Sequence, residues 1–232
     1  MNSKANKGSI KEAKRTNRNK EVSDRVVQRM TDYLTILVEL AKSEEFVNSI
    51  ELAKIMGTTS AQVRKDLSTF GEFGVRGKGY EISSLVDIIE KILSINVMNN
   101  VIIVGHGRMG ELISSNSQLL GKGFKLVGVF DKDINKIGTK IDGLGITIKD
   151  MDELKHESKK LKVDVAILSV TKEYAQIVAD RIIMSGIVAI LNMTTYKLEV
   201  PKNVAVMNID ISAKLQELNY WRKNMDFNKT NK

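Results

Sequence analysis

The sequence predicts an α/β protein of two domains, and three observations support this prediction. Four apolar residues, 101–104, precede the glycine pattern Gly105-His-Gly107-Arg-Met-Gly110. Apolar strand-like runs and helix-like segments alternate from there to about residue 207, which indicates a parallel sheet with helices on both faces. Before residue 98 the chain has amphipathic helical spacing and one Gly-rich hairpin pattern. A mainly helical N-terminal domain is therefore expected to precede an α/β domain.

The composition limits the classes to which the chain can belong. Hydrophobic residues make up 42% of 232 residues, and cysteine is missing, which excludes disulfides and thiolate metal sites. No apolar run approaches the roughly 18 residues of a membrane span. We therefore expect a cytoplasmic protein with no metal and no membrane partner. The net charge of +8 is unevenly placed, so it is not by itself a sign of nucleic-acid binding.

The charge is concentrated in the first segment. Residues 1–20 carry seven Lys/Arg and one Glu but almost no apolar residues. We expect residues 1–21 to form a disordered basic tail. This tail either only solubilises the chain or adds non-specific affinity for phosphates. Residues 226–232 are expected to form a second tail.

The first domain is expected over residues 22–97 and begins with two helices. Apolar residues at helical spacing predict an amphipathic helix over residues 23–42. Ser49 is expected to cap a short helix over residues 50–56, which Gly57 ends.

A third helix is predicted from a capping box formed by Thr59 and Gln62, and it extends to about Phe70. Small, amide, hydroxyl and cationic side chains share its polar face, and such groups suit base edges and phosphates in a major groove. The candidate DNA-binding residues of this helix are Ser60, Ala61, Gln62, Arg64, Lys65 and Ser68. Two short helices joined by a tight turn predict a helix-turn-helix. Alone, this face could equally be a solvated surface.

A Gly-rich stretch over residues 73–82 favours the DNA-binding interpretation. Its apolar flanks predict a β-hairpin with Arg76 and Lys78 at the tip. A helix-turn-helix followed by a basic hairpin is a winged helix, so double-stranded DNA is the expected partner. A helix capped by Ser84, over residues 85–93, leads into the second domain.

The glycine pattern predicts a Rossmann dinucleotide-binding domain over residues 98–209. Gly105 allows a tight turn, Gly107 lets a pyrophosphate approach the backbone, and Gly110 lets the next helix, expected over 111–120, pack close to the sheet. The helix N-terminus offers N–H groups to the phosphates. The other loop residues expected at the cofactor are His106, Arg108 and Met109.

A second apolar strand, 124–130, ends in Asp131. That carboxylate can accept hydrogen bonds from both hydroxyls of an adenine ribose. Its charge would repel a 2′-phosphate, which favours NADH and NAD⁺ over their phosphorylated forms, although the adjacent Lys132 could soften this preference. The alternative is a Gly-rich turn in an α/β domain without a ligand.

Further strands are expected near residues 146–148, 163–170, 187–191 and 204–207. Because ligands lie beyond the carboxyl ends of such strands, residues 169–172 and 192–195 are candidates for the site. A terminal helix over 210–223 carries an apolar stripe of Ile211, Leu215, Leu218 and Trp221. This helix either packs on its own domain or docks on a second subunit.

These segments together resemble the Rex family of redox-sensing transcriptional repressors. The resemblance covers about Val22 to Arg222. It rests on the segments Ala61-Gln-Val-Arg-Lys-Asp-Leu-Ser-Thr-Phe-Gly71, 73–80, 105–110, 130–133 with 136–138, 189–192 and 200–201. The first of these is far more specific than the glycine pattern.

The resemblance implies a homodimer that binds inverted-repeat operator DNA and is released by NADH, whereas NAD⁺ permits binding. It implies a domain-swapped helix over residues 210–225. It adds the cofactor residues Lys136, Val170, Thr171, Asn192 and Met193, and it makes Arg29 and Asp210 the switch residues. The chain has Asn116, Thr171 and Thr195 where many members have Tyr, Pro and Pro, all on the nicotinamide side.

Two other functions are disfavoured by the residues. A dehydrogenase needs a proton donor and usually a substrate domain. The chain has only His106, in the glycine loop, and His156, on a polar segment, and too few residues follow the last strand for another domain. We therefore expect no catalytic residues and no enzyme activity. A nucleotide-regulated interaction module that does not bind DNA is weakened by the basic residues of the third helix and the hairpin.

Overall fold

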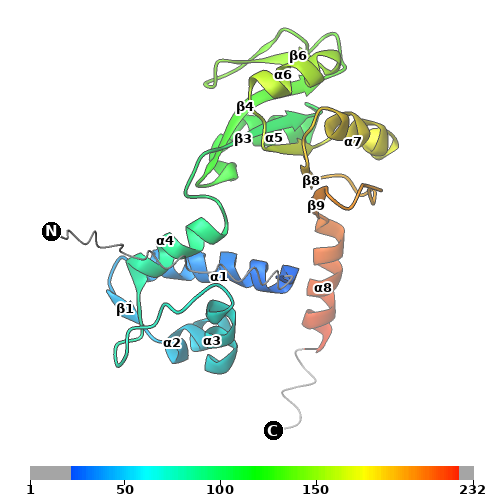
Figure 1. Ribbon diagram of the computed structural model, residues 1–232. Helices are drawn as coiled ribbons and strands as arrows, with labels where there is room; N and C mark the ends of the chain where they lie inside the picture. The colour runs from blue at the N-terminus through cyan, green and yellow to red at the C-terminus, as the bar shows by residue number, and fades with distance from the viewer. Residues whose placement is uncertain (1–21, 225–232) are drawn as a thin grey trace, which may run out of the picture. The chain divides into compact units, whose positions relative to one another are not determined.

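The computed structural model describes residues 22–224 (Figure 1). The chain forms two compact units, the first ending at Ile89 and the second beginning at Glu90. The expected tails over residues 1–21 and 226–232 lie outside the described residues.

The first unit is mainly helical. Its elements are α1 (Asp24–Leu40), β1 (Phe46–Val47), α2 (Ser49–Met56), α3 (Ser60–Ser68), β2 (Tyr80–Glu81) and the first part of α4 (Ile82–Ile92). Helix α1 buries Met30, Tyr33 and Leu37 completely, at the spacing that its amphipathic pattern predicted. The core is completed by Leu52, Val63, Leu67, Ile82, Leu85 and Ile89.

Two helix starts differ from expectation. Helix α2 is capped by Asn48 rather than by Ser49, because Asn48 accepts hydrogen bonds from the backbone N–H groups of Ile50 and Glu51 at 2.9 and 3.0 Å. The Thr59 hydroxyl accepts from the backbone N–H of Gln62 at 3.2 Å, but the Gln62 side chain does not complete the box and turns instead to Asp66. The third helix also ends at Ser68, before Phe70.

The expected wing is shorter than a full hairpin. Its two sides meet at one antiparallel bridge between Val75 and Gly79, with the exposed Arg76 and Lys78 in the turn between them. The strand that follows, β2, pairs with β1 and not with residues 73–75. Helix α4 then starts at Ile82, and Ser84 is not its cap. The sequence pattern missed β1 because it is only two residues long.

The second unit is built on a sheet that, within the described residues, has seven strands in the order β5-β6-β4-β3-β7-β8-β9. The strands are β3 (Asn99–Val104), β4 (Phe124–Asp131), β5 (Lys140–Ile141), β6 (Ile146–Asp150), β7 (Val165–Leu168), β8 (Ala189–Asn192) and β9 (Ala205–Asn208). All neighbours are parallel except the pair β5–β6. The parallel α/β sheet is thus confirmed, and the antiparallel edge hairpin is an addition to it.

Helices cover both faces of this sheet. One core joins the sheet to α6 (Leu154–Lys160) and α7 (Ala175–Met184), and the other joins it to α5 (Arg108–Ser115). The helix expected over residues 111–120 is interrupted at Asn116, and a 3₁₀ turn (Ser117–Leu120) follows α5. Short 3₁₀ turns (Met151–Glu153 and Lys172–Tyr174) likewise begin the segments that lead into α6 and α7.

The last element, α8 (Ile211–Asn224), follows β9 (Figure 1). It buries none of its side chains against the part of the chain that the structure describes. The four residues of its apolar stripe, Ile211, Leu215, Leu218 and Trp221, are all about three-fifths exposed, from 60% to 63%. This argues against the alternative in which the stripe packs on its own domain.

Candidate functional site

The glycine loop joins β3 to α5 at the carboxyl edge of the sheet. Gly105 has a φ of +95°, and a Cβ there would lie 2.7 Å from the carbonyl oxygen of Ser169. A Cβ on Gly110 would meet the carbonyl oxygen of Gly105 far inside van der Waals contact. A Cβ on Gly107, at the N-cap of α5, would meet nothing within 4 Å. Gly105 and Gly110 thus allow backbone segments to pack closely against each other, whereas Gly107 leaves open space above the loop.

Asp131, at the end of β4, is tied to this loop. Its carboxylate accepts hydrogen bonds from the backbone N–H of His106 at 2.6 Å and of Asp133 at 2.9 Å. The residue is only 8% exposed. Burial raises the pKa of Asp131, but the hydrogen bonds from Asp133 and His106 and the charge of Lys136 outweigh burial and lower the pKa below its usual value. The carboxylate is therefore ionised at neutral pH and keeps lone pairs for further donors.

Lys136 and His106 complete the loop. The Lys136 ammonium donates to the carbonyl of His106 at 3.0 Å and lies 3.8 Å from the Asp131 carboxylate. The imidazole Nε2 of His106 lies 2.9 Å from the hydroxyl of Ser114, on α5. Burial is the main cause that lowers the pKa of His106, so the ring is neutral at neutral pH. The His106 side chain thus makes a contact within the fold, and its place at the cofactor stays a prediction.

A cavity of about 540 Å³ opens beside the loop. The expected cofactor residues that line it are Gly105, Gly107, Arg108, Met109, Asp131, Lys136, Val170 and Thr171. Its size suits a small-molecule ligand. The backbone N–H groups at the start of α5 and the open face of Gly107 can receive a phosphate, and Asp131 can receive sugar hydroxyls. The residues present thus fit a dinucleotide.

Ser169 and Lys132, which the sequence analysis also considered, line the cavity as well. Five other lining residues were not singled out from the sequence: Met151, Tyr174, Ile177, Val178 and Arg181. The last four follow helical spacing on the segment that begins α7, and this spacing was the available signal. Arg181 is held in place because its guanidinium donates to the Met151 carbonyl at 2.9 Å and to Asp152 at 2.6 Å.

Asn192 and Met193, at the end of β8, do not line this cavity. The Asn192 side chain is completely buried; it donates to the carbonyl of Tyr196 and to Asn208 and accepts from the backbone N–H and hydroxyl of Thr194. Met193 packs against the core on the α5 side. In this structure Asn192 therefore fixes the loop after β8.

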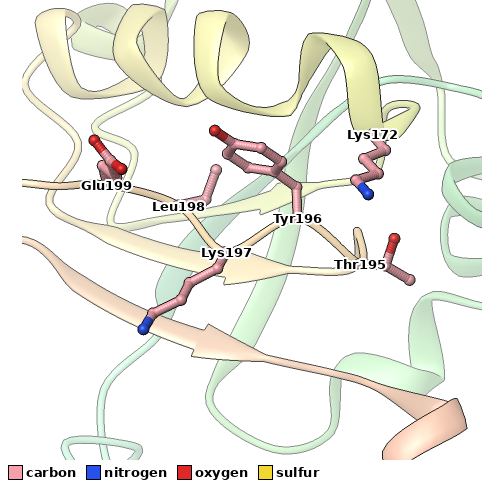
Figure 2. A pocket seen from close by; sticks show the side chains of 6 residues that line it. All are labelled: Lys172, Thr195, Tyr196, Lys197, Leu198 and Glu199. Carbon is pink, nitrogen blue, oxygen red and sulfur yellow. The ribbon is translucent and has the colours of Figure 1, made fainter.

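Thr195 belongs to a second hollow of about 500 Å³ (Figure 2). This hollow is lined by Lys172, Thr195, Tyr196, Lys197, Leu198 and Glu199. Figure 2 shows the Tyr196 ring directed towards helix α7 and the Lys172 side chain on the same side as Thr195. Lys172 follows Thr171, which lines the larger cavity, so the two hollows adjoin at one loop.

The first unit presents a cationic face on α3. Ala61, Arg64, Lys65 and Ser68 are exposed. Arg64 donates to the Ser49 hydroxyl at 3.0 Å, and the Lys78 ammonium of the wing lies 4.9 Å from the centre of the Phe46 ring. Gln62 differs from the other candidates, because its amide donates to Asp66 at 2.7 Å and so turns towards α1.

Asp66 is the buried polar centre of this unit, with 1% of its surface exposed. Arg29 donates to both of its carboxylate oxygens, from Nε at 2.5 Å and from a terminal nitrogen at 2.7 Å. The hydroxyl of Tyr33 donates to it at 3.1 Å, and Gln62 is the third partner. The network joins α1 to α3 through the expected switch residue Arg29. Asp210, the other expected switch residue, accepts a hydrogen bond from the backbone N–H of Ala213 at 3.0 Å.

Within residues 22–224, no group of three or more His, Cys, Asp or Glu is arranged to hold a metal ion. No helix in the same range is long and apolar enough to cross a membrane.

Two family models match the chain. The model described as "Putative DNA-binding protein N-terminus" matches residues 21–68, and the model described as "CoA binding domain" matches residues 96–196. The first match contains α1 to α3, and the second contains the glycine loop and Asp131. The fold and the site therefore define a class of protein in which a winged-helix DNA-binding domain precedes a Rossmann nucleotide-binding domain.

Relatives narrow the class to one family. The chain is 37% identical to the redox-sensing transcriptional repressor Rex of Carboxydothermus hydrogenoformans, over 86% of this chain and 96% of the relative. It is 39% identical to Rex of Thermotoga petrophila, over 84% of this chain and 93% of that protein. The chain belongs to the Rex family of redox-sensing transcriptional repressors. Its predicted family is confirmed, as is the prediction that it is a regulator and not an enzyme.

Solved structures agree with this assignment. The chain matches RSP, a Rex-family repressor, in complex with β-NAD⁺ and operator DNA, with a TM-score of 0.82 and 34% identity, over 90% of this chain and 96% of that one. It matches RSP in complex with β-NADH with a TM-score of 0.80 and 33% identity, over 90% and 99% of the two chains. The predicted order of winged helix and Rossmann domain is confirmed.

Proposed function

We propose that this protein is a transcriptional repressor that binds operator DNA through its winged helix and leaves the DNA when NADH occupies the Rossmann cavity. It thereby senses the ratio of NADH to NAD⁺ in the cytoplasm. The observation that carries the proposal is the glycine loop beside the ionised, buried Asp131, in the same chain as a helix-turn-helix with exposed cations. The RSP complexes with operator DNA and with both nucleotides support it.

The cavity residues divide between the parts of the cofactor. Gly107 and the first N–H groups of α5 receive the pyrophosphate, and Asp131 accepts from the adenine ribose. The apolar side chains of Met151, Ile177 and Val178 line the cavity and suit the adenine ring. The pyrophosphate, the adenine ribose and the adenine ring are common to NADH and NAD⁺. The protein must therefore distinguish the two nucleotides at the nicotinamide end, where NAD⁺ carries a charge that NADH lacks. Val170 and Thr171 are our candidates there.

The DNA is read by α3 and the wing. Ser60, Ala61, Arg64, Lys65 and Ser68 face the groove, and Arg76 and Lys78 contact the backbone from the turn. Gln62 acts by orienting Asp66, to which its amide donates a hydrogen bond. Loss of a base-reading arginine costs about 1–3 kcal/mol and relaxes specificity, whereas loss of a phosphate contact weakens all sequences similarly.

A parallel titration tests the proposal. The operator duplex of the RSP complex is labelled, and its affinity for the protein is measured at fixed salt with NADH, NAD⁺ or coenzyme A added. We expect NADH to lower the affinity, NAD⁺ to preserve it, and coenzyme A to have no effect. An affinity that is the same with all three ligands would contradict the proposal.

Arg64→Ala should weaken the binding of operator DNA. Lys42→Ala is the matched control, because Lys42 is an exposed lysine just after α1.

Asp131→Asn should lower the affinity for NADH by about 10- to 100-fold, because one charge-assisted hydrogen bond contributes about 1.5–3 kcal/mol. The same change should narrow the preference for NADH over NADPH, since the repulsion of a 2′-phosphate is lost. Calorimetric titration measures both. Asp133→Asn is the control, because Asp133 does not line the cavity. Equal affinity of the unchanged protein for NADPH and NADH would contradict this role of Asp131.

The protein is proposed to be a homodimer in which α8 packs on the partner subunit. A two-fold dimer also matches an inverted-repeat operator. Replacing both Leu215 and Leu218 with alanine should weaken the dimer by at least about 100-fold, since each leucine contributes about 1.5–3 kcal/mol when buried. Sedimentation equilibrium measures this, with the exposed Gln216→Ala as control. A double variant that dimerises as tightly as the parent would exclude this role for α8.

Arg29 and Asp210 stay proposed as the residues that couple the two domains. The proposed coupling runs from Asp210, just before α8, to Arg29, whose guanidinium already donates to Asp66. A response to NADH that survives both Arg29→Ala and Asp210→Ala would show that the coupling runs through other residues.

A further inference from the structure

Two side chains from segments that follow different strands meet in the cavity. Lys132 follows β4, and Tyr174 lies in the segment between β7 and α7. Both line the cavity. The Lys132 ammonium lies 3.5 Å from the centre of the Tyr174 ring, a position in which the negative face of the ring attracts a cation.

The position of Lys132 matters because of its neighbour. Asp131 is the residue that meets the 2′ position of the adenine ribose in a Rossmann domain, and domains that accept a 2′-phosphate provide a cation there. The lysine ammonium is a point charge on a flexible stem, so its position depends on its partners. Two other cations of the cavity already have partners, since Lys136 donates to His106 and Arg181 to Met151.

We propose that Tyr174 is a specificity-determining residue, because its ring holds the Lys132 ammonium away from the 2′ position. With Lys132 held there, the carboxylate of Asp131 meets a 2′-phosphate without neutralisation, and NADPH is rejected. Without the ring, the ammonium is free to move to the phosphate. This inference rests on the proposed function.

The test compares the dissociation constants of NADPH and NADH, because a general loss of packing would affect both nucleotides alike. In Tyr174→Leu the ratio of the NADPH constant to the NADH constant should fall by about twofold to fivefold, the effect of one exposed cation–π contact. Tyr174→Phe keeps the ring face and should keep the parent ratio. In the Lys132→Met background, Tyr174→Leu should leave the ratio unchanged.

Three results would overturn the inference while NADH binding persists. The ratio could stay at the parent value in Tyr174→Leu, it could fall equally in Tyr174→Phe, or it could still fall in the Lys132→Met background. Failure of the parent protein to bind NADH would be a different result, because it would overturn the proposed function as well.

Discussion

Gly110→Ala should destabilise the nucleotide-binding unit by about 3 kcal/mol or more, at the upper end of the cost of overpacking. The added methyl group would meet the carbonyl oxygen of Gly105, which is backbone and cannot turn away. In a helix with free space around the glycine, the same change would stabilise the protein by about 1 kcal/mol. A loss of stability would therefore indicate that the backbone at Gly105 leaves no room for a side chain. Denaturant unfolding followed by circular dichroism measures it. A variant at least as stable as its parent would disprove this packing role.

Gly107→Ala is the matched control for this variant. Its Cβ would meet nothing within 4 Å, and Gly107 has a φ of −77°, which alanine adopts freely. We expect its free energy of unfolding to stay within about 0.5 kcal/mol of the parent. Its affinity for NADH should fall by about tenfold or more, because the methyl group occupies the approach of the pyrophosphate. Titration of folded Gly107→Ala with NADH therefore measures the effect of a methyl group on ligand binding alone, without an effect on helix packing.

The second large effect is expected at Asp66. Asp66→Ala should destabilise the winged-helix unit by about 3 kcal/mol, since removing one partner of a buried ion pair leaves the other without compensation. Arg29 and Tyr33 would both lose their acceptor. Operator affinity should also fall, because α3 loses its attachment to α1. The exposed Glu72→Ala is the control. Unchanged unfolding and operator binding in Asp66→Ala would contradict this view of the network.

The same carboxylate predicts a pH dependence. Burial raises the pKa of Asp66, but hydrogen bonds from Arg29, Gln62 and Tyr33 outweigh burial and lower it below the usual value. The network therefore contributes fully above the unfolded pKa of about 4, and its contribution is lost as the pH falls through the lower folded pKa. Asp66→Asn should reduce this loss of stability in acid. An identical acid profile in the variant would show that Asp66 does not set it.

The elements that could be predicted from the sequence are those that residues close together in the chain specify. Helix α1, strands β3 and β4 and the glycine loop are where their apolar spacing and glycines indicated. Asp131 could be predicted for the same reason, because it follows a recognisable strand at a recognisable distance from the loop. The apolar stripe of α8 could also be predicted from its spacing. Its exposure in the described chain agrees with the interpretation in which this helix docks on a second subunit.

The remaining features arise from contacts between segments that are far apart in the chain. Gln62 looks like a DNA-reading residue on its own helix, but Asp66 and Arg29 give it a partner in the fold. Asn192 follows a strand end, as a ligand residue would, yet the loop that returns to Tyr196 uses its amide internally. The meeting of Lys132 with Tyr174 joins two loops of the sheet. Sequence periodicity describes which face a residue occupies, whereas the partner that satisfies a polar side chain on that face depends on how the separate elements pack.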